Sequence, residues 1–200
     1  MALLRAATPG DIGPVIETER VVLRAPQMSD YPAWAELRAT SRDFLVPWEP
    51  LWALDELSRA SFRRRVRHYL HDMREDMGYA LFVYDTQSPA LVGGITLCNV
   101  RRGVTQSCTL GYWVGAAHAK QGYMTAAVRA VVPFVFDSLE LHRLEAACLP
   151  TNTASMRLLK RVGFTREGLA RRYLRINGDW RDHVLYALLD TDSRGYGTGG

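Results

Sequence analysis

The sequence predicts an α/β fold built on a mixed β-sheet. Runs typical of strands alternate with runs typical of helices along most of the 200-residue chain. Three strand-like runs follow one another between residues 79 and 114 without a helix, and Asn177-Gly178 is a strong hairpin signal between two more. Directly joined strands pair antiparallel, so a doubly wound parallel sheet is disfavoured. We expect about six to seven strands flanked by about four helices.

The predicted elements follow from hydrophobic patterning and from residues that start or end helices. The strands are expected at residues 20–26, 79–85, 90–100, 105–114, 143–149, 165–176 and 179–189. The helices are expected at residues 31–40, 56–76, 125–140 and 151–163.

Capping and breaking residues justify the helix bounds. Ser29 and Asp30 offer an N-cap to the first helix. Residues 41–57 are rich in tryptophan and proline and are predicted to form a loop, and the second helix after it is expected from its composition. Pro133 should bend or tighten the third helix.

The fourth helix has a start and a stop signal. Thr151 or Asn152 can cap its beginning, and Gly163 can end it. The length of the chain and its 48% hydrophobic content indicate one domain. We place that domain at residues 19–190, after an N-terminal arm at 1–18 and before a glycine-rich, flexible tail at 191–200.

Several classes of protein are disfavoured by composition. No apolar run approaches the ~18 residues that a membrane span needs, so no membrane partner is expected. Cys98, Cys108 and Cys148 lack CxxC spacing, which disfavours disulfide or zinc frameworks and favours a reducing cytoplasmic location. His68 and His71 are three residues apart but have no evident third ligand, so no metal is predicted.

The net charge of +4 is compatible with an anionic cofactor or a polyanionic partner and requires neither. Four arginines lie within residues 63–67, where a helix would spread them over a solvated face. No specific nucleic-acid partner is therefore predicted, although contact of this helix with RNA is an alternative.

The segment HAKQGYMTAA, residues 118–127, has the character of an anion-binding turn at a helix start. Free N–H groups and the positive end of the helix dipole favour an anion there. Gly122 permits an unusual backbone conformation and close approach, and Lys120 adds charge. The segment lacks G-x-x-x-x-G-K-[ST], which disfavours ATP or GTP held with magnesium. An ordinary strand-to-helix turn is the alternative.

Three blocks of the chain carry a family resemblance when taken together: LGYWV…AKQGYMTAA, LEAACLPTNTASMRLLKRVGFTREG and YLRINGDWRDHVLYAL. Together they resemble the GNAT superfamily of N-acetyltransferases, and within it the RimJ/RimL-type branch that acetylates protein N-termini. FLVPWEP is similar to that branch as well, and the resemblance extends from about Val21 to Leu189. It implies the GNAT fold and acetyl-CoA as the cofactor.

The resemblance implies a set of cofactor-binding residues. The family's pyrophosphate loop has the form Gln/Arg-x-x-Gly-x-Gly/Ala, and this chain departs from it at Ala119 and Met124. Since backbone amides form the cradle, coenzyme A binding is expected to survive, with the pantetheine arm along the strand that ends at Val114. The cofactor-binding residues are expected to be Tyr112, Trp113, Val114, Ala119, Lys120, Gln121, Gly122, Tyr123, Met124, Thr125, Asn152, Ser155 and Lys160.

The resemblance also implies catalytic residues on the fourth helix. The Asn that matches Asn152 contacts the cofactor arm or a water, and the Ser that matches Ser155 is a candidate acid for the departing thiolate. Other GNAT branches use a tyrosine where this chain has Leu159, which leaves Ser155 as the better donor. The alternative is that Asn152 only caps the helix and that Ser155 only fits a small site. Glu145 and Glu167 are candidate bases, or else structural partners of an arginine.

The acceptor is expected to bind between the loop FLVPWEP and the final hairpin. Trp48 and Trp52 could form its wall, Glu49 could hold a cationic N-terminus, and Tyr173 and His183 lie on the hairpin. The alternative is that the tryptophans pack on the core, and that Tyr173 and His183 pack within the core or the hairpin. The predicted enzyme transfers acetyl directly, in a ternary complex, to a protein N-terminus of the Ala or Ser type, such as a ribosomal protein. A small-molecule amine acetyltransferase, for an antibiotic or polyamine, and a non-catalytic acyl-CoA-binding module are the alternatives. A monomer or homodimer is expected.

Overall fold

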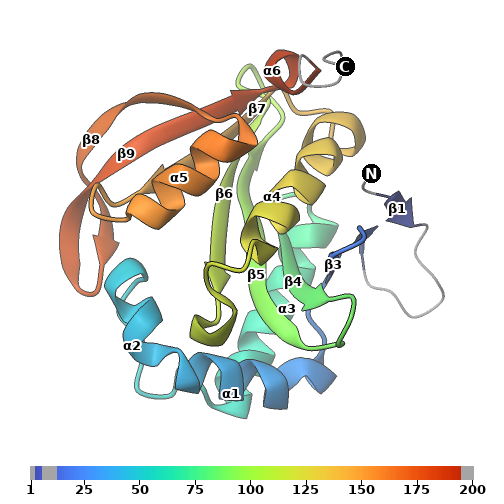
Figure 1. Cartoon of the computed structure of the whole chain (residues 1–200), viewed down its shortest axis with the longest axis vertical. Coiled ribbons are helices and arrows are strands. Elements are labelled where there is room, and N and C mark those ends of the chain that lie inside the picture. The colour runs from blue at the N-terminus through green and yellow to red at the C-terminus, as the bar shows by residue number, and fades with distance from the viewer. Residues whose placement is uncertain (1–2, 6–12, 195–200) are drawn as a thin grey trace.

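A nine-stranded mixed sheet organises the part of the chain that this computed structural model describes, residues 3–5 and 13–194 (Figure 1). The strands are β1 (Leu3–Arg5), β2 (Val15–Glu17), β3 (Val21–Arg24), β4 (Tyr79–Asp85), β5 (Leu91–Arg101), β6 (Ser107–Val114), β7 (Arg143–Cys148), β8 (Thr165–Ile176) and β9 (Asp179–Leu189). Their order in the sheet is β1-β2-β3-β4-β5-β6-β7-β9-β8. The β6–β7 pair is parallel and every other pair is antiparallel, which confirms the predicted mixed sheet.

Helices cover both faces of the sheet. They are α1 (Tyr31–Thr40), α2 (Arg42–Leu45), α3 (Arg59–Arg74), α4 (Tyr123–Pro133), α5 (Thr153–Val162) and α6 (Asp190–Arg194). Short 3-10 helices occupy Met28–Asp30, Val46–Trp48 and Ala116–His118. Within the described ranges, no helix is both long and apolar enough to span a membrane.

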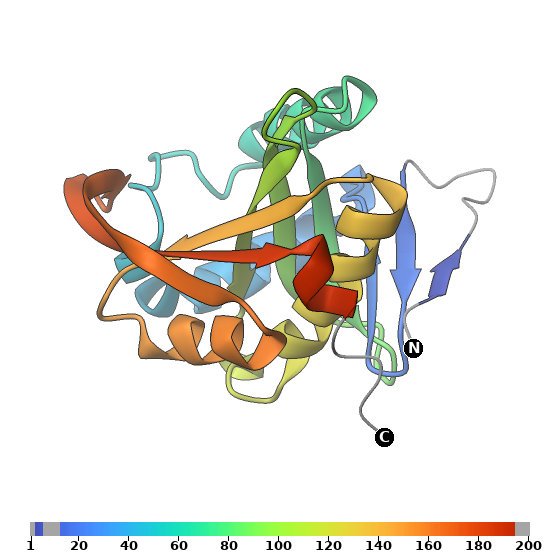
Figure 2. The ribbon, with the colours of Figure 1, turned by 90° about the horizontal axis from the view of Figure 1, so that it is seen from above.

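Two clusters of buried side chains form the core. The larger one packs α4 and α5 against one face of the sheet, around residues such as Val128 and Leu159. The smaller one packs α1 and α3 against the other face, around Trp34, Phe62 and Phe82. Figures 1 and 2 show α4 and α5 on the face opposite to α3, and the long β8–β9 hairpin curving away from the remaining strands. The central strands therefore have one buried cluster on each of their two faces.

The structure adds short elements that patterning did not predict. β1 and β2 come from the segment expected to be an arm, so the sheet has nine strands instead of six to seven. The predicted loop at 41–57 contains α2 and a 3-10 turn, and α6 begins at Asp190, where the tail was expected. The rest of the predicted arm and tail, residues 1–2, 6–12 and 195–200, lies outside the described residues.

Pro133 ends α4, as a residue without a backbone N–H tends to do. The chain then continues through Phe134–Ser138 as a π-helical turn. The irregularity expected at Pro133 is therefore present, but as a wider turn and not as a tighter one.

Candidate active site

The two parallel strands β6 and β7 separate part way along their length. They pair only over the first four residues of β6, ending at Leu110 opposite Ala146. On its other side β6 stays paired with β5 as far as Val114. Among the described residues, no strand borders 111–114 on the β7 side, so backbone groups there are available to a ligand. We call this part of β6 the open edge.

A hydroxyl pair connects the open edge to helix α5. The Tyr112 hydroxyl lies 2.5 Å from Ser155 Oγ. Asn152 is the N-cap of α5, and its Oδ1 accepts a 3.0 Å hydrogen bond from the Ser155 backbone N–H. Burial raises the pKa of Tyr112, so its hydroxyl keeps its proton. The structure thus brings Asn152 and Ser155 to the open edge, and it adds a phenol that sequence reasoning did not assign a side-chain role.

The predicted anion loop, from Ala119 to Thr125, is a left-handed turn followed by the first turn of α4. Lys120 and Gly122 have positive φ angles of 61° and 86°. The Ala126 N–H donates to the Gly122 carbonyl at 3.0 Å, so the three residues between them have no helical partner for their N–H groups. These N–H groups and the helix dipole form a cradle for an anion.

Side chains contribute less to this cradle than its backbone does. Met124 is buried in the core. The Gln121 side-chain amide donates to the Ala117 carbonyl at 2.7 Å and so stabilises the loop itself. Lys120 is exposed. The cradle is therefore formed mainly by N–H groups, with Lys120 as the nearby cation.

Lys160 lies at the end of α5 opposite to Asn152. It is in the last turn of α5, about 12 Å along the helix axis from Asn152. Its neighbour Arg161 accepts a 3.2 Å hydrogen bond, through its carbonyl, from Arg129 in the middle of α4. Among the described residues, no hydrogen bond or ion pair joins Lys160 to Asn152 or Ser155, so its role toward the cofactor stays a prediction.

A buried ion pair lies on the opposite face of the open edge. Arg38 of α1 binds both oxygens of Glu49, at 3.1 and 2.5 Å, and Trp52 Nε1 donates to Glu49 at 2.8 Å. The guanidinium lies 4.5 Å from the ring centroid of Trp52 and 5.1 Å from that of Trp113. Trp113 follows Tyr112 on β6, so its side chain points to the other face. The Glu49 carboxylate, expected to hold a cationic N-terminus, is thus occupied by Arg38 and Trp52.

The β8–β9 hairpin carries the other predicted acceptor contacts. The Tyr173 ring lies 5.9 Å from the buried His183 ring, in an edge-on arrangement. His183 Nδ1 is 3.0 Å from the Arg181 carbonyl, which in the neutral ring makes Nδ1 the donor. At the hairpin tip, the Asn177 N–H donates to the Glu49 carbonyl at 2.9 Å. The predicted acceptor loop and the hairpin are therefore in contact.

A cavity of about 270 Å³ lies where the loop meets the hairpin. Its lining is formed by Arg42, Asp43, Val46, Pro47, Leu51, Trp52 and Asn177. Trp48, from the adjacent 3-10 turn, is 36% exposed. Two of the three predicted aromatic contacts of the loop and hairpin, Trp48 and Tyr173, thus remain accessible to an acceptor.

Both candidate bases bind the same arginine. Arg143 Nε donates to Glu145 at 2.8 Å, and its two terminal nitrogens contact the Glu167 carboxylate. The ion pair with Arg143 holds the pKa of Glu167 below its usual range. Arg143 begins β7, so it draws both carboxylates toward the end of the strand where β6 and β7 are still paired. This geometry gives neither carboxylate a position that favours proton transfer at the open edge.

The three cysteines are free thiols. Cys148 is the last residue of β7 and is buried, and burial raises the pKa of its thiol. A thiol of this kind is a weak nucleophile. Within 3–5 and 13–194, no group of three or more His, Cys, Asp or Glu could hold a metal ion.

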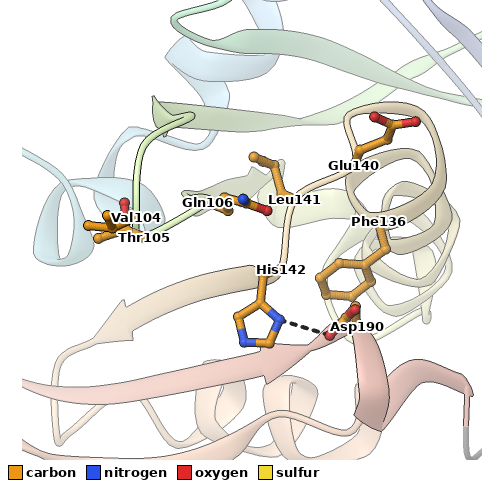
Figure 3. A pocket seen from close by; sticks show the side chains of 8 residues that line it. All are labelled: Val104, Thr105, Gln106, Phe136, Glu140, Leu141, His142 and Asp190. Atoms are coloured by element: carbon orange, nitrogen blue, oxygen red, sulfur yellow. Dashed lines mark hydrogen bonds and ion pairs between the residues drawn. The ribbon is translucent and has the colours of Figure 1, made fainter.

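A second cavity, of about 460 Å³, lies at the other end of β6 and β7 (Figure 3). Its lining is formed by Val104, Thr105, Gln106, Phe136, Glu140, Leu141, His142 and Asp190. His142 Nδ1 is 3.0 Å from Asp190 Oδ1. These residues precede β6 and β7 or follow β9, so this cavity contains none of the predicted site residues.

Sequence reasoning missed Arg38, which connects the acceptor loop to Trp113. The sequence gives only a weak indication of this role. Arg38 follows Trp34 by four residues on the same helix face, which places a cation among buried aromatic side chains. A lone arginine on an otherwise apolar helix face indicates a buried partner, but the spacing does not identify Glu49 as that partner.

Comparisons with known proteins agree with this geometry. The family model "Acetyltransferase (GNAT) domain" matches residues 20–165. The chain is 33% identical to the [ribosomal protein uS5]-alanine N-acetyltransferase of Escherichia coli, over 88% of this chain and 91% of that protein. It is also 33% identical to the probable N-acetyltransferase YjcK of Bacillus subtilis, over 89% and 98%.

A solved structure superposes on a similar share of the chain. Mycobacterium smegmatis RimJ in complex with CoA-disulfide superposes with a TM-score of 0.81 at 33% identity, covering 86% of this chain and 82% of that one. The matched family region contains the open edge, the anion loop and the hydroxyl pair. The chain therefore belongs to the GNAT acetyltransferase family.

Proposed function

We propose that this enzyme transfers the acetyl group of acetyl-CoA to the N-terminal α-amino group of a protein, and that its acceptor is a ribosomal protein beginning with alanine or serine. The open edge of β6 carries the proposal, because the Tyr112–Ser155 pair lies on one face of it and the tryptophan-lined loop on the other. The 33% sequence identity with the Escherichia coli uS5-alanine acetyltransferase supports a ribosomal protein as the acceptor.

The donor would bind along the α4 and α5 face of the sheet. The N–H groups that follow Gly122 are suited to the pyrophosphate, since they form an anion cradle with little side-chain obstruction. The pantetheine arm would lie along residues 111–114, whose backbone groups can bond to its amides. The thioester would then lie near the Tyr112 and Ser155 hydroxyls.

Acetyl transfer requires one bond to form and one to break. The neutral amine attacks the thioester carbon, and the resulting oxyanion is stabilised by backbone N–H groups of the open edge. Collapse of the intermediate breaks the C–S bond and releases the CoA thiolate, which takes a proton from Ser155 Oγ. Tyr112, 2.5 Å away, can pass its proton to Ser155 in the same step, and the phenolate that forms then takes a proton back from solvent, which the raised pKa of Tyr112 favours.

The amine must also lose protons, and neither candidate carboxylate is well placed to take them. Glu145 and Glu167 are both bound to Arg143. An α-amino group has a pKa of about 7.7–8, so a useful fraction is neutral near pH 7 without a base. We propose that water carries away the remaining proton, and that Glu145 and Glu167 are structural.

The residues of the predicted acceptor loop and of the β8–β9 hairpin favour a peptide over a polycation as the acceptor. A polyamine or aminoglycoside needs several carboxylates as counter-charges. Glu49 is already neutralised by Arg38 and hydrogen-bonded by Trp52. Among the described residues, the lining of the cavity of about 270 Å³ contains a single carboxylate, that of Asp43. Exposed aromatic side chains such as Trp48 and Tyr173 suit the backbone and small side chains at the start of a polypeptide. The cytoplasmic location and the monomeric or dimeric state stay predictions.

The test compares acceptors with the purified enzyme and acetyl-CoA. Peptides that begin with Ala or Ser should be acetylated at their α-amines far faster than spermidine or an aminoglycoside. Mass spectrometry of total ribosomal proteins, from cells with and without the gene, should then identify an acceptor. Preference for the small amines would contradict the proposal. Binding of CoA without acetylation of any amine would indicate a non-catalytic binding module.

A further inference from the structure

We infer that Arg20 is a positioning residue for the donor site. It binds the Gln121 carbonyl in the pyrophosphate loop and thereby orients the loop. Arg20 lies in the turn between β2 and β3, about a hundred residues before the loop. Its Nη2 donates a 2.5 Å hydrogen bond to the Gln121 carbonyl. This inference rests on the donor site proposed above, but not on the identity of the acceptor.

The geometry of one peptide bond explains how Arg20 would act. None of the described peptide bonds is cis, so the Gln121 carbonyl and the Gly122 N–H point in opposite directions. When Arg20 holds the Gln121 carbonyl, the Gly122 N–H points away from Arg20 and can join the N–H groups of the α4 first turn in binding the pyrophosphate. The cradle thereby gains one oriented donor.

Two further contacts fix Arg20 in this place. Its guanidinium lies 4.7 Å from the ring centroid of Tyr123, the first residue of α4. The Tyr123 hydroxyl in turn donates to Asp85 Oδ2 at 3.0 Å, at the end of β4. Three segments that are far apart in the sequence are thus joined behind the loop.

The backbone of the loop needs such support. Lys120 adopts a positive φ without being glycine, and Gly122 adopts another, so two of three consecutive residues are in the left-handed region. No side chain caps the start of α4. A cation at the Gln121 carbonyl therefore offsets the tendency of this loop to relax when no pyrophosphate is bound.

Calorimetric titration of the full-length enzyme with CoA and with 3′-dephospho-CoA tests the inference. Arg20→Gln should weaken both ligands about tenfold, because both contain the pyrophosphate that the loop binds. Arg20→Lys should regain part of the loss, since an ammonium group can also donate to the carbonyl. The KM for acetyl-CoA should rise while kcat at saturation stays the same. Arg63→Gln, an exposed change on α3, is the matched control.

Three outcomes would overturn the inference. Unchanged affinity of Arg20→Gln for both ligands would show that the loop needs no support from Arg20. A loss for CoA alone would show that Arg20 contacts the 3′-phosphate directly. A loss for both ligands that comes with a lower kcat and a lower melting temperature of the free protein would indicate a general structural role. Failure to find a protein acceptor would leave these results unaffected.

Discussion

The Tyr112 hydroxyl and Ser155 Oγ are 2.5 Å apart, although they come from β6 and α5 and lie 43 residues apart in the sequence. The contact crosses the gap that opens where β6 and β7 separate. Asn152 fixes the other side of Ser155 by accepting from its backbone N–H. A buried phenol, a hydroxyl and a helix cap are thus joined here, and we propose that they donate the proton to the departing thiolate.

Replacing Ser155 by alanine should reduce kcat about 100-fold, because the leaving thiolate loses its proton donor. The affinity for CoA should change little, since the cradle around Gly122 is intact. Steady-state assays with a peptide acceptor and calorimetry with CoA would measure the two quantities. Thr153→Ala, an exposed change in the same helical turn, is the control. Full activity of Ser155→Ala would show that the thiolate leaves without this hydroxyl.

Replacing Tyr112 by phenylalanine should reduce kcat about tenfold, and the effect should largely disappear when Ser155 is already alanine. The reason is that Tyr112 acts through Ser155, so the two changes remove the same proton path. The double-mutant cycle, measured with one peptide at saturating acetyl-CoA, tests this coupling.

The pH profile provides a second check on Tyr112. Burial raises the pKa of Tyr112 above its usual value of 10.0, so the phenol keeps its proton as the acceptor amine loses its own. The wild-type rate should therefore rise with pH through about pH 8 and stay level to about pH 10. A fall in the wild-type rate between about pH 8 and about pH 10 that is absent from Tyr112→Phe would contradict this assignment. Additive losses of kcat in the Tyr112–Ser155 double-mutant cycle would also contradict it.

Much of the fold was predictable because local signals determine it. The strand expected at 79–85 is found at Tyr79–Asp85, and the helix expected at 31–40 is found at Tyr31–Thr40. Asn152 and Gly163 cap α5 as the sequence indicates. β1 and β2 were missed because strands of three residues show no periodicity and form only through pairing with their neighbours.

The site was less predictable, because its contacts join distant segments. Asn152 and Ser155 could be found from the resemblance to the GNAT superfamily, but the Tyr112 hydroxyl could be placed beside them only from the path of β6 in the structure. The same holds for Glu49: the sequence leaves it available to a substrate, whereas in the structure Arg38 binds both of its carboxylate oxygens. Sequence distance gives no information about such pairs.

Gly122→Val should weaken CoA binding more than Lys120→Ala. Gly122 has a φ of 86°, which a β-branched residue resists strongly, and the change would move the N–H groups that form the cradle. Removal of the exposed Lys120 side chain removes only a screened charge. Calorimetry with CoA gives both affinities, and a Gly122→Ala variant separates strain from bulk. A larger loss for Lys120→Ala would show that side-chain charge dominates recognition.

Cys148→Ser should keep most of the wild-type turnover. Direct transfer needs no acyl-enzyme, and burial raises the pKa of Cys148, which makes its thiol a poor nucleophile. Serine has a similar shape, so packing at the end of β7 should survive. The rate with a peptide acceptor measures this, and mass spectrometry of enzyme mixed with acetyl-CoA alone should find no stable acetyl adduct. A loss of activity together with an adduct on the wild-type thiol would indicate a covalent route.

Glu49→Gln should destabilise the fold by about 3 kcal/mol, because it leaves the buried Arg38 guanidinium without its charged partner. The side chains of Arg38 and Glu49 are only 6% and 18% exposed, so water cannot replace the lost carboxylate. Denaturant titration measures the change in the free energy of unfolding. Asp55→Asn breaks a pair with Arg64 whose side chains are 51% and 62% exposed, and it should leave the midpoint nearly unchanged. Equal effects of the two substitutions would show that burial does not strengthen the Arg38–Glu49 pair.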